Sequence, residues 1–305
     1  MSVIDKMKIL VGALYNDNAR FIVLNKLGLY DNMPDEQYLK KMFKIKMGRE
    51  LNLHNPQTFN EKLQWLKLNN RNPKYTTMVD KYNVKKYVGE IIGEDYIIPT
   101  LGVWNNFDQI DFSKLPSKFV IKCTHDSGGV VVCKDKNKLD FKTAKKTIDK
   151  CLKRNYYLSS REWPYKGVKP QIIVEKYLEM KDENCAEFKL FCYNGKFNWV
   201  MVSKGIGHSN SRTNDAFDKN FKHIPVQLTW PNSIKEIVKP AEFDKLIRLS
   251  EKLSNDIPQV RVDWYLLNGK IYFGELTFYH AGGFCDFKPP IYDKILGEDL
   301  VLKKL

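Results

Sequence analysis

The chain of 305 residues lacks several patterns that would assign a function at once. No apolar run approaches the roughly 20 residues that a transmembrane helix needs. The six cysteines form no CxxC pair, and no Cys/His cluster has zinc-ligand spacing. The phosphate-binding patterns GxGxxG and GxxxxGK are absent. The Asp-x-Asp pattern common in metal-dependent glycosyltransferases is absent too. A nucleotide, if one binds, must be held in another way.

The charge is not concentrated in one segment either. The net charge is +14, yet there is no block of five or six basic residues. A basic surface attracts anions in general, whereas scattered lysines usually form a solvated face, so we expect no nucleic-acid partner. An aromatic content of 13% indicates a folded chain rather than a disordered one. We interpret the cysteines as reduced, which predicts a cytoplasmic location.

The pattern along the chain predicts an α+β fold. Thr58 and Glu61 have the spacing of a capping box, which begins a helix. The Asn-Gly pairs at 194–195 and 268–269 predict two hairpins. Hairpins with a helix between them favour α+β layers over a parallel βαβ sheet. We expect a helical N-terminal region, a second part with a glycine turn, and a third part rich in strands: 1–72, 73–170 and 171–305.

The first candidate site is the segment KFVIKCTHDSGGVVVC at 118–133, which reads as strand, turn and strand. Lys122 lies in the first strand, and a half-buried lysine there needs an anionic partner. Glycines at 128 and 129 let the turn bring free backbone N–H groups close to a phosphate. The alternative is an outward-facing lysine beside an ordinary hairpin turn.

The second candidate site is the hairpin VRVDWYLLNGKIYFGELTF at 260–278. Asp263 and Glu275 lie on its two strands and can share one face. Two carboxylates so placed repel unless a cation lies between them, and Mg²⁺ bound by carboxylates and substrate phosphates fits this description. Arg261 points to the same face and can clamp a phosphate or carboxylate. The alternative is a salt-bridged trio of these three residues.

Weaker signals surround these two segments. Glu175 ends the apolar strand QIIVEKYLE at 171–179, where backbone groups beside apolar side chains suit the edge of an adenine. His125 and His280 lie beside the predicted site and have the chemistry of a general base. For each histidine, positioning or packing is the alternative.

In combination these segments resemble the ATP-grasp superfamily and, more narrowly, the TupA-like proteins of teichuronopeptide biosynthesis. Matching stretches run from NPQTFNEKLQWLKL at 55–68, through VDKYNVKKYV and RNYYLSSREWPY, to FKPP at 287–290. The resemblance implies an ATP-grasp fold, in which two α+β subdomains grip the nucleotide, with an N-terminal helical extension.

The resemblance also implies roles for individual residues. The predicted nucleotide site consists of two phosphate-side lysines, a glycine lid, an adenine hinge and a ribose-binding acid: Lys81, Lys122, Ser127, Gly128, Gly129, Glu175, Lys176, Leu178 and Glu187. The predicted ligands for one or two Mg²⁺ ions are Asp263, Glu275 and Thr277, the last at a position where the superfamily often has asparagine. The predicted catalytic group is Arg261, Lys189 and His125.

The implied activity is an ATP- and Mg²⁺-dependent ligase that joins a carboxylate to an amine through an acyl phosphate, in surface polysaccharide biosynthesis. The expected substrate is a small molecule or an anionic saccharide. Association with the periphery of the membrane polysaccharide machinery stays open. The alternatives are a glycosyltransferase of capsule synthesis, an ATP-dependent kinase, and a nucleotide-binding protein without catalysis.

Overall fold

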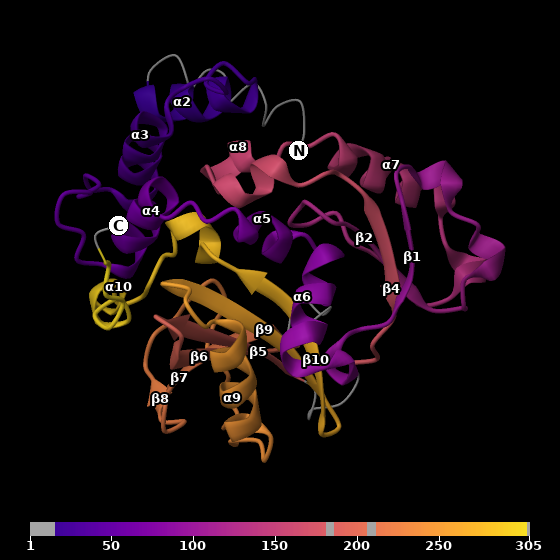
Figure 1. Cartoon of the computed structure of the whole chain (residues 1–305). Coiled ribbons are helices and arrows are strands. Elements are labelled where there is room, and N and C mark those ends of the chain that lie inside the picture. Colours follow the sequence, from indigo (N-terminus) through magenta and orange to yellow (C-terminus); the bar gives the residue numbers. More distant parts are fainter. Residues whose placement is uncertain (1–15, 181–185, 206–211, 304–305) are drawn as a thin grey trace. The chain divides into compact units, whose positions relative to one another are not determined.

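The computed structural model describes residues 16–180, 186–205 and 212–303. Contacts between Cα atoms divide the chain into two compact units, Met1–His54 and Asn55–Leu305 (Figure 1). None of the described helices is both long and apolar enough to cross a membrane.

The first unit is helical in its described part, as predicted. Helix α2 (Asp17–Lys26) begins at Asn16, whose side chain accepts hydrogen bonds from the free N–H groups of the first turn. Helix α3 (Asp35–Met47) follows. Phe21 of α2 is buried and its ring lies 5.9 Å from that of Tyr38. Ring contacts of this kind hold the two helices together.

The second unit begins with helices α4 (Phe59–Asn69) and α5 (Lys74–Val79). The predicted capping box at the start of α4 is confirmed, because Thr58 and Glu61 each bond the other's main chain. The two compact units divide before α4, whose apolar side chains pack in the core of the second unit. As a division into domains, 1–72, 73–170 and 171–305 stays a prediction.

The other helices of the second unit are short. The α-helices are α6 (Asn83–Ile92), α7 (Phe141–Leu152), α8 (Tyr157–Ser160), α9 (Phe243–Leu253) and α10 (Ile291–Ile295). Single 3₁₀ turns connect them: η1 (Glu94–Tyr96), η2 (Phe107–Gln109), η3 (Phe112–Lys114), η4 (Lys136–Lys138), η5 (Trp163–Gly167) and η6 (His280–Gly283).

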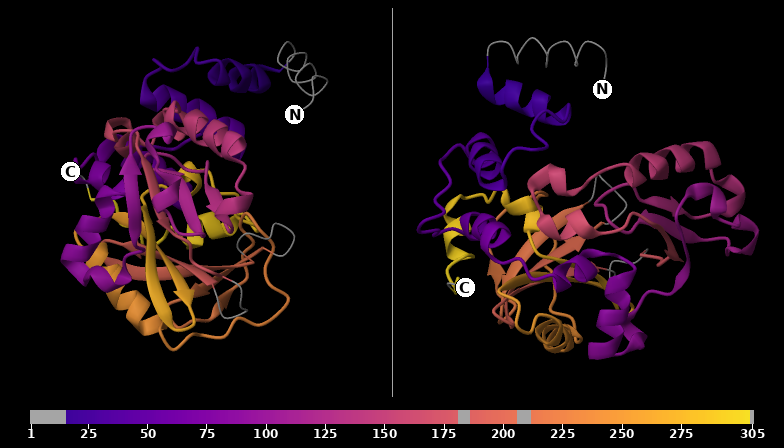
Figure 2. Two further views of the ribbon diagram at one scale, coloured as in Figure 1. Left: turned by 90° about the vertical axis from the view of Figure 1, so that its right-hand side faces the viewer. Right: turned by 45° about the horizontal axis from the view of Figure 1, so that its top comes forward.

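Two antiparallel sheets form the body of the second unit (Figure 2). The smaller sheet has the order β1-β4-β2-β3, from β1 (Thr100–Trp104), β4 (Ile172–Lys176), β2 (Phe119–Cys123) and β3 (Val131–Cys133). The larger sheet has the order β10-β9-β5-β6-β7-β8. Its strands are β10 (Lys270–Thr277), β9 (Gln259–Leu267), β5 (Ala186–Tyr193), β6 (Lys196–Lys204), β7 (Thr213–Asp218) and β8 (His223–Ile224).

Both predicted Asn-Gly hairpins are present in the larger sheet. They join β5 to β6 and β9 to β10, and Asn194 and Asn268 have φ of 50° and 47°. Left-handed residues at both central positions fit the right-handed twist of the strands, which is why Asn-Gly is favoured there.

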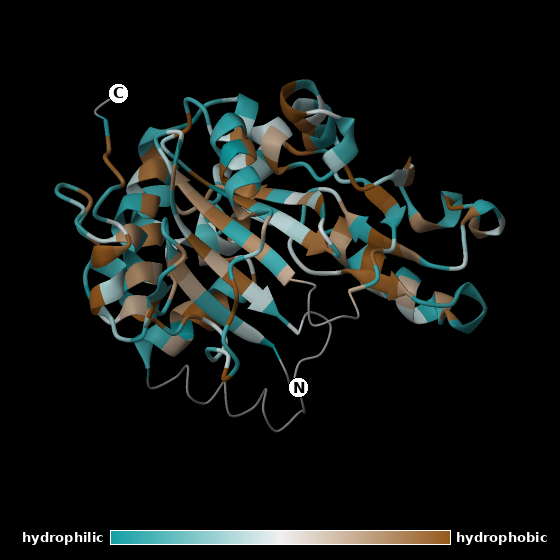
Figure 3. Cartoon of the chain, turned by 90° about the horizontal axis from the view of Figure 1, so that it is seen from below, coloured by the Kyte–Doolittle hydropathy of each residue, from teal (hydrophilic) through white to brown (hydrophobic). Residues whose placement is uncertain are grey.

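Each sheet has one face covered by a helix. Helix α7 packs on β2 and β3, over a core that includes Phe119 and Ile121. Helix α9 packs on β5, β6 and β9, where Trp264 donates a hydrogen bond to Ser250. Apolar residues accordingly run along the strands, and hydrophilic ones gather on the outer helices and loops (Figure 3). Because side chains alternate across a strand, the neighbours of these core residues point to the opposite faces.

Candidate functional site

A pocket of about 300 Å³ lies between the two sheets, on the side of each sheet that is opposite to α7 or α9. Val120 and Lys122 of the smaller sheet contribute to it, and so do Tyr265 and Glu275 of the larger one. Eight of the predicted site residues line it: Lys81, Lys122, Ser127, Gly128, Glu175, Lys176, Leu178 and Glu275. Segments distant in sequence therefore converge on one cavity.

Lys122 is held at the pocket wall by Glu175. Its Nζ lies 2.6 Å from Oε2 of Glu175, on the neighbouring strand β4. The other carboxylate oxygen, Oε1, lies 2.6 Å from Nζ of Lys85 on α6. Burial alone would raise the pKa of Glu175, but the two ammonium groups outweigh it and hold the pKa below its usual value. Glu175 is therefore a charged anchor between two lysines.

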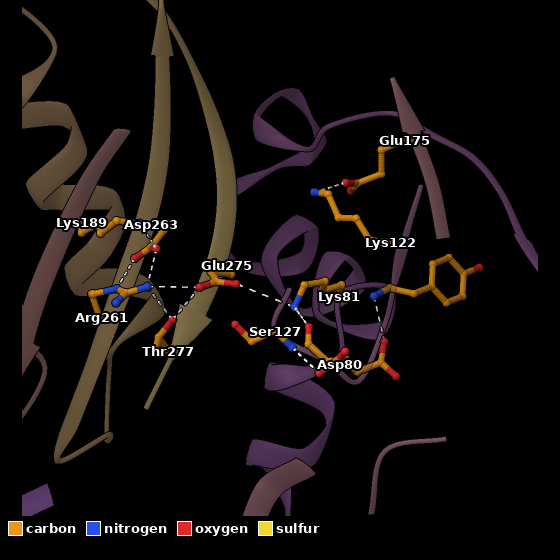
Figure 4. Close-up of polar contacts among 12 residues, drawn as sticks. Asp80, Lys81, Lys122, Ser127, Glu175, Lys189, Arg261, Asp263, Glu275 and Thr277 are labelled. Carbon is orange, nitrogen blue, oxygen red and sulfur yellow. Dashed lines mark hydrogen bonds and ion pairs between the residues drawn. The ribbon is translucent and has the colours of Figure 1, made fainter. Parts of the chain in front are cut away.

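The glycine turn begins at Ser127, which lines the same pocket as Lys122 and Glu175 and lies apart from them in Figure 4. Gly128 and Gly129 have φ of 101° and 59°, which favour glycine. A Cβ atom at Gly129 would come within 1.9 Å of Sγ of Cys151. Asp126, just before the turn, accepts a hydrogen bond from the Ser127 N–H at 2.8 Å and pairs with Arg154. The turn is thus fixed by its own sequence and by the end of α7.

Lys81 connects the glycine turn to the carboxylates of the larger sheet. Its Nζ donates to the main-chain oxygen of Asp126 at 2.9 Å and lies 3.8 Å from Oε2 of Glu275 (Figure 4). The Lys81 side chain is 17% exposed and borders the pocket. An ammonium group placed between a turn and a carboxylate is suited to meet an anion that enters the pocket.

The carboxylate cluster spans three neighbouring strands. The register aligns Lys189 of β5 with Asp263 of β9, and Asp263 with Glu275 of β10. Arg261 binds both oxygens of Asp263 at 2.6 Å and Oε1 of Glu275 at 3.2 Å. Lys189 also bonds Asp263, at 2.8 Å. Figure 4 shows the same groups pointing toward one another. The salt-bridged arrangement that the sequence left open is the one present here.

These contacts set the charge of Glu275. Burial acts to raise the pKa of its carboxyl, but Lys81, Arg261 and Lys189 lower it to about 2. Its side chain is still 39% exposed and faces the pocket. Thr277 donates its hydroxyl to Oε1 of Glu275 at 2.9 Å. Glu275 therefore stays ionised near neutral pH and offers Oε2 to the pocket.

The oxygen atoms of this cluster fit a hard cation such as Mg²⁺ only in part. Carboxylate and hydroxyl oxygens are what Mg²⁺ prefers, and Glu275 and Thr277 supply them. Asp263 is 1% exposed, and protein cations already bond both of its oxygens. Among the described residues, no group of three Asp, Glu, His or Cys has metal-site geometry. Glu275 can thus bind a cation without rearrangement. Asp263 could bind one only if Arg261 released one of its carboxylate oxygens.

Besides Lys189, Arg261, Asp263 and Thr277 of the carboxylate cluster, three further predicted residues lie outside the pocket lining. Glu187 lies 2.6 Å from Lys189 and takes part in the carboxylate cluster. Gly129 shapes the turn without lining the cavity. His125 is buried, and its Nε2 lies 3.1 Å from the main-chain oxygen of Arg154. Burial also lowers the pKa of His125. This histidine braces the segment beneath the turn and does not meet the cavity, although it was predicted as catalytic.

The sequence allowed two roles for His280, a general base or a packing residue. In the structure His280 contacts Arg261 and does not line the pocket. Its Nδ1 lies 2.7 Å from Nη1 of Arg261. Burial, with Arg261 and Lys189 nearby, lowers its pKa well below the usual value. The neutral ring therefore accepts a hydrogen bond from the guanidinium and orients it.

Sequence reasoning missed Lys85 and most of the apolar lining. The apolar residues come from both sheets and the linking segments: Ile98, Val120, Val130, Val132, Met180 and Tyr265. Lys85 gave no usable signal, because it is adjacent to Lys86 in α6 and only the folded chain shows which of the two lysines turns inward. The apolar set gave none either, because β-branched residues in strands read equally well as core.

The sequence model of the TupA-like ATP-grasp family matches residues 61–301. The chain belongs to this family. The match confirms the predicted family and the α+β ATP-grasp fold.

Solved structures similar to the chain include a ligase and a synthetase by their names. A D-alanine–D-alanine ligase from Bacillus anthracis is 18% identical, with 66% of this chain and 56% of that one covered and a TM-score of 0.37. The ADP complex of purK, an N5-carboxyaminoimidazole ribonucleotide synthetase, is 15% identical, with 72% and 50% covered and a TM-score of 0.40. The chain thus spans only about half the length of these proteins, and the likeness is too distant to bear on activity. No curated protein matches the chain.

Proposed function

We propose that this protein is an ATP- and Mg²⁺-dependent ligase that joins a carboxylate to an amine through an acyl phosphate. The observation that carries the proposal is the pocket in which Lys81, Lys122 and the ionised Glu275 border the glycine turn. Membership of the ATP-grasp family supports the class of enzyme. Each step below rests on groups that lie in or beside this cavity.

The adenine of ATP would lie against the apolar part of the pocket. Val120, Ile98 and Met180 supply an apolar surface there. The main chain from Lys176 to Leu178 borders the same region and follows the end of β4. Backbone N–H and C=O groups beside apolar side chains give a purine both surface contact and an edge to hydrogen-bond. Glu187 would take the ribose, as the family resemblance implies.

The phosphates would lie between the two lysines and the glycine turn. Lys81 and Lys122 both line the pocket, and so do Ser127 and Gly128 of the glycine turn. In phosphoryl transfer the main contribution of a protein is to position the groups and to offset the charge of the transferred phosphoryl. Two ammonium groups beside a fixed turn match this requirement.

One or two Mg²⁺ ions would be held by Glu275, with Thr277 and, on rearrangement of Arg261, Asp263. When bound, Mg²⁺ supplies Lewis-acid stabilisation of the phosphate oxygens. Glu275 is kept ionised for this purpose by its neighbours, since its pKa lies at about 2.

The proposed reaction has two displacements. A carboxylate oxygen of the substrate attacks the γ-phosphorus, a new P–O bond forms, and ADP leaves with the electrons of the broken P–O bond. The amine nitrogen then attacks the acyl carbon and the C–N bond forms. The acyl C–O bond breaks, inorganic phosphate leaves with its electron pair, and the nitrogen releases one proton to solvent. Arg261, fixed by Asp263 and His280, is placed at the edge of Glu275 to steady the acyl phosphate. Lys189 fixes Asp263 from the other side.

We further propose a sugar carboxylate as the acceptor, with an amine or amino acid as the second substrate, in surface polysaccharide synthesis. This pathway is the one that the resemblance to the TupA-like proteins implies, and a net charge of +14 suits an anionic saccharide. A cytoplasmic site, with contact to the membrane polysaccharide machinery, belongs to the same proposal.

The test is a binding and product measurement on the full chain. Calorimetry should show saturable binding of MgATP and loss of that binding when EDTA removes Mg²⁺. Mass spectrometry of ATP, uronic acid and amino-acid mixtures should show ADP and an amide. Binding of UDP-sugars in place of ATP would point to a glycosyltransferase. A phosphorylated acceptor would point to a kinase.

A further inference from the structure

Lys85 of α6 carries an ammonium group that lies close to the pocket but outside its lining. Its side chain is 13% exposed and it does not line the cavity. Its Nζ has three acceptors: the main-chain oxygen of Ile98 at 2.7 Å, Oγ1 of Thr100 at 2.7 Å and Oε1 of Glu175 at 2.6 Å. A lysine ammonium has three N–H donors, so all of them are used inside the protein.

Lys122 differs from Lys85 in how its ammonium is used. Its side chain is 21% exposed, lines the pocket, and pairs with Oε2 of Glu175 at 2.6 Å. That contact uses one of its three donors. The carboxylate of Glu175 is thus shared, with one oxygen for the fixed Lys85 and one for Lys122 at the cavity.

This sharing of the Glu175 carboxylate by two lysines matters when a polyphosphate enters the pocket. For Lys122 to turn toward a phosphate, it must weaken its contact with Glu175, whose side chain is only 7% exposed. A buried carboxylate left without a counter-ion is strongly destabilising. Lys85 removes that obstacle, since it stays bonded to Glu175 whatever Lys122 does.

We propose that Lys85 is a positioning residue that serves as the permanent counter-ion of Glu175 and thereby frees Lys122 for the phosphates of the nucleotide. The inference rests on the proposed ATP site and adds a residue to it. Lys85 itself touches no nucleotide, because its donors are already used. The buried trio carries one net positive charge, which Lys122 presents to the cavity.

The test compares MgATP affinity, by calorimetry, in Lys85→Met and in the matched control Lys86→Met. Lys86 is the next residue of α6, is 84% exposed and pairs only with Glu90 at 3.8 Å among the described residues. We expect Lys85→Met to raise the Kd about tenfold and Lys86→Met to leave it unchanged. Equal affinities in the two variants would overturn the inference.

A double-mutant cycle separates this role from a merely structural one. In a Glu175→Gln background there is no buried carboxylate for Lys85 to neutralise, so adding Lys85→Met should change the Kd by less than about twofold. A loss that persists at full size in that background would show that Lys85 acts through packing, and would overturn the proposal. Lys85→Arg, which keeps the charge, should recover part of the affinity.

Should Lys85→Met fail to fold, Lys85→Gln removes the charge and keeps an N–H donor for the same acceptors. We then expect a severalfold loss of MgATP affinity, and an unchanged Kd would contradict the proposal. Wild-type protein that does not bind MgATP would instead defeat the proposed function, so the two failures are distinguishable.

Discussion

At the scale of single residues, the site is a set of paired charges rather than of free ones. Glu175 lies between Lys85 and Lys122, and Glu275 lies between Lys81 and Arg261. The sequence could suggest Lys122 and Glu275 because a charged residue inside an apolar strand needs a reason to be there. It could not show which partners they have, since those partners come from distant segments.

The first prediction at this scale concerns Glu275. Glu275→Ala should abolish ADP formation, since the variant loses the pocket-facing carboxylate. The fold should persist, because the side chain is 39% exposed and leaves no large cavity. Product analysis and circular dichroism measure the two effects. The exposed Glu50→Ala is the control, and full turnover in Glu275→Ala would remove the metal assignment.

The second prediction at this scale concerns pH. The pKa of Glu275 is lowered to about 2, so the carboxylate contributes stability that is fully present above its ordinary pKa near 4.5. That contribution should fade as the pH falls from about 4.5 toward 2. Urea unfolding of wild type and Glu275→Gln should show the stability difference narrowing over this window. A difference that stays constant down to pH 2 would contradict the ion-pair account.

At the scale of elements, the conformation of the glycine turn is set by its own sequence and its position by α7. The sequence reveals the turn, because two adjacent glycines between strands indicate left-handed residues. It does not reveal that Cys151 of α7 lies under Gly129, which makes the second glycine necessary for space as well as for φ. Contacts between elements of this kind depend on the tertiary fold.

Gly129→Ala should therefore be more damaging than an ordinary substitution at positive φ. Gly48→Ala is the matched control, since Gly48 has φ of 69° and nothing within 4 Å of its Cβ position. The left-handed conformation should cost about 1–2 kcal/mol in both. Gly129→Ala should lose more unfolding free energy than Gly48→Ala, and bind MgATP more weakly, because of the clash with Cys151. Equal losses of unfolding free energy, measured by urea unfolding, would show that α7 shifts at little energetic cost.

At the scale of the whole molecule, hydrogen bonds connect the first helix of the unit Asn55–Leu305 to a segment near the end of that unit. Asn60 of α4 donates to the main-chain oxygen of Cys285 at 2.9 Å and accepts from its N–H at 2.8 Å. The local pattern predicted α4, its capping box and both hairpins, because these depend on residues near in sequence. It did not predict that α4 packs in the core of the ATP-grasp unit, which depends on partners more than 200 residues away.

The prediction at this scale is that Asn60→Ala destabilises the ATP-grasp unit. The substitution leaves a buried N–H and a buried C=O of Cys285 without their partner, at about 1–3 kcal/mol each. Asn69→Ala, at the exposed end of the same helix, is the control and should change little. Urea unfolding measures both, and equal stability of the two variants would argue against this connection.

The central claim is that the cavity between the two sheets holds the phosphates of ATP through Lys122. The most direct measurement is the calorimetric titration of MgATP into wild type and Lys122→Ala, with the exposed Lys142→Ala as control. The account predicts saturable binding to wild type and to the control, and a Kd raised at least tenfold in Lys122→Ala. Equal MgATP affinity in all three proteins would contradict it.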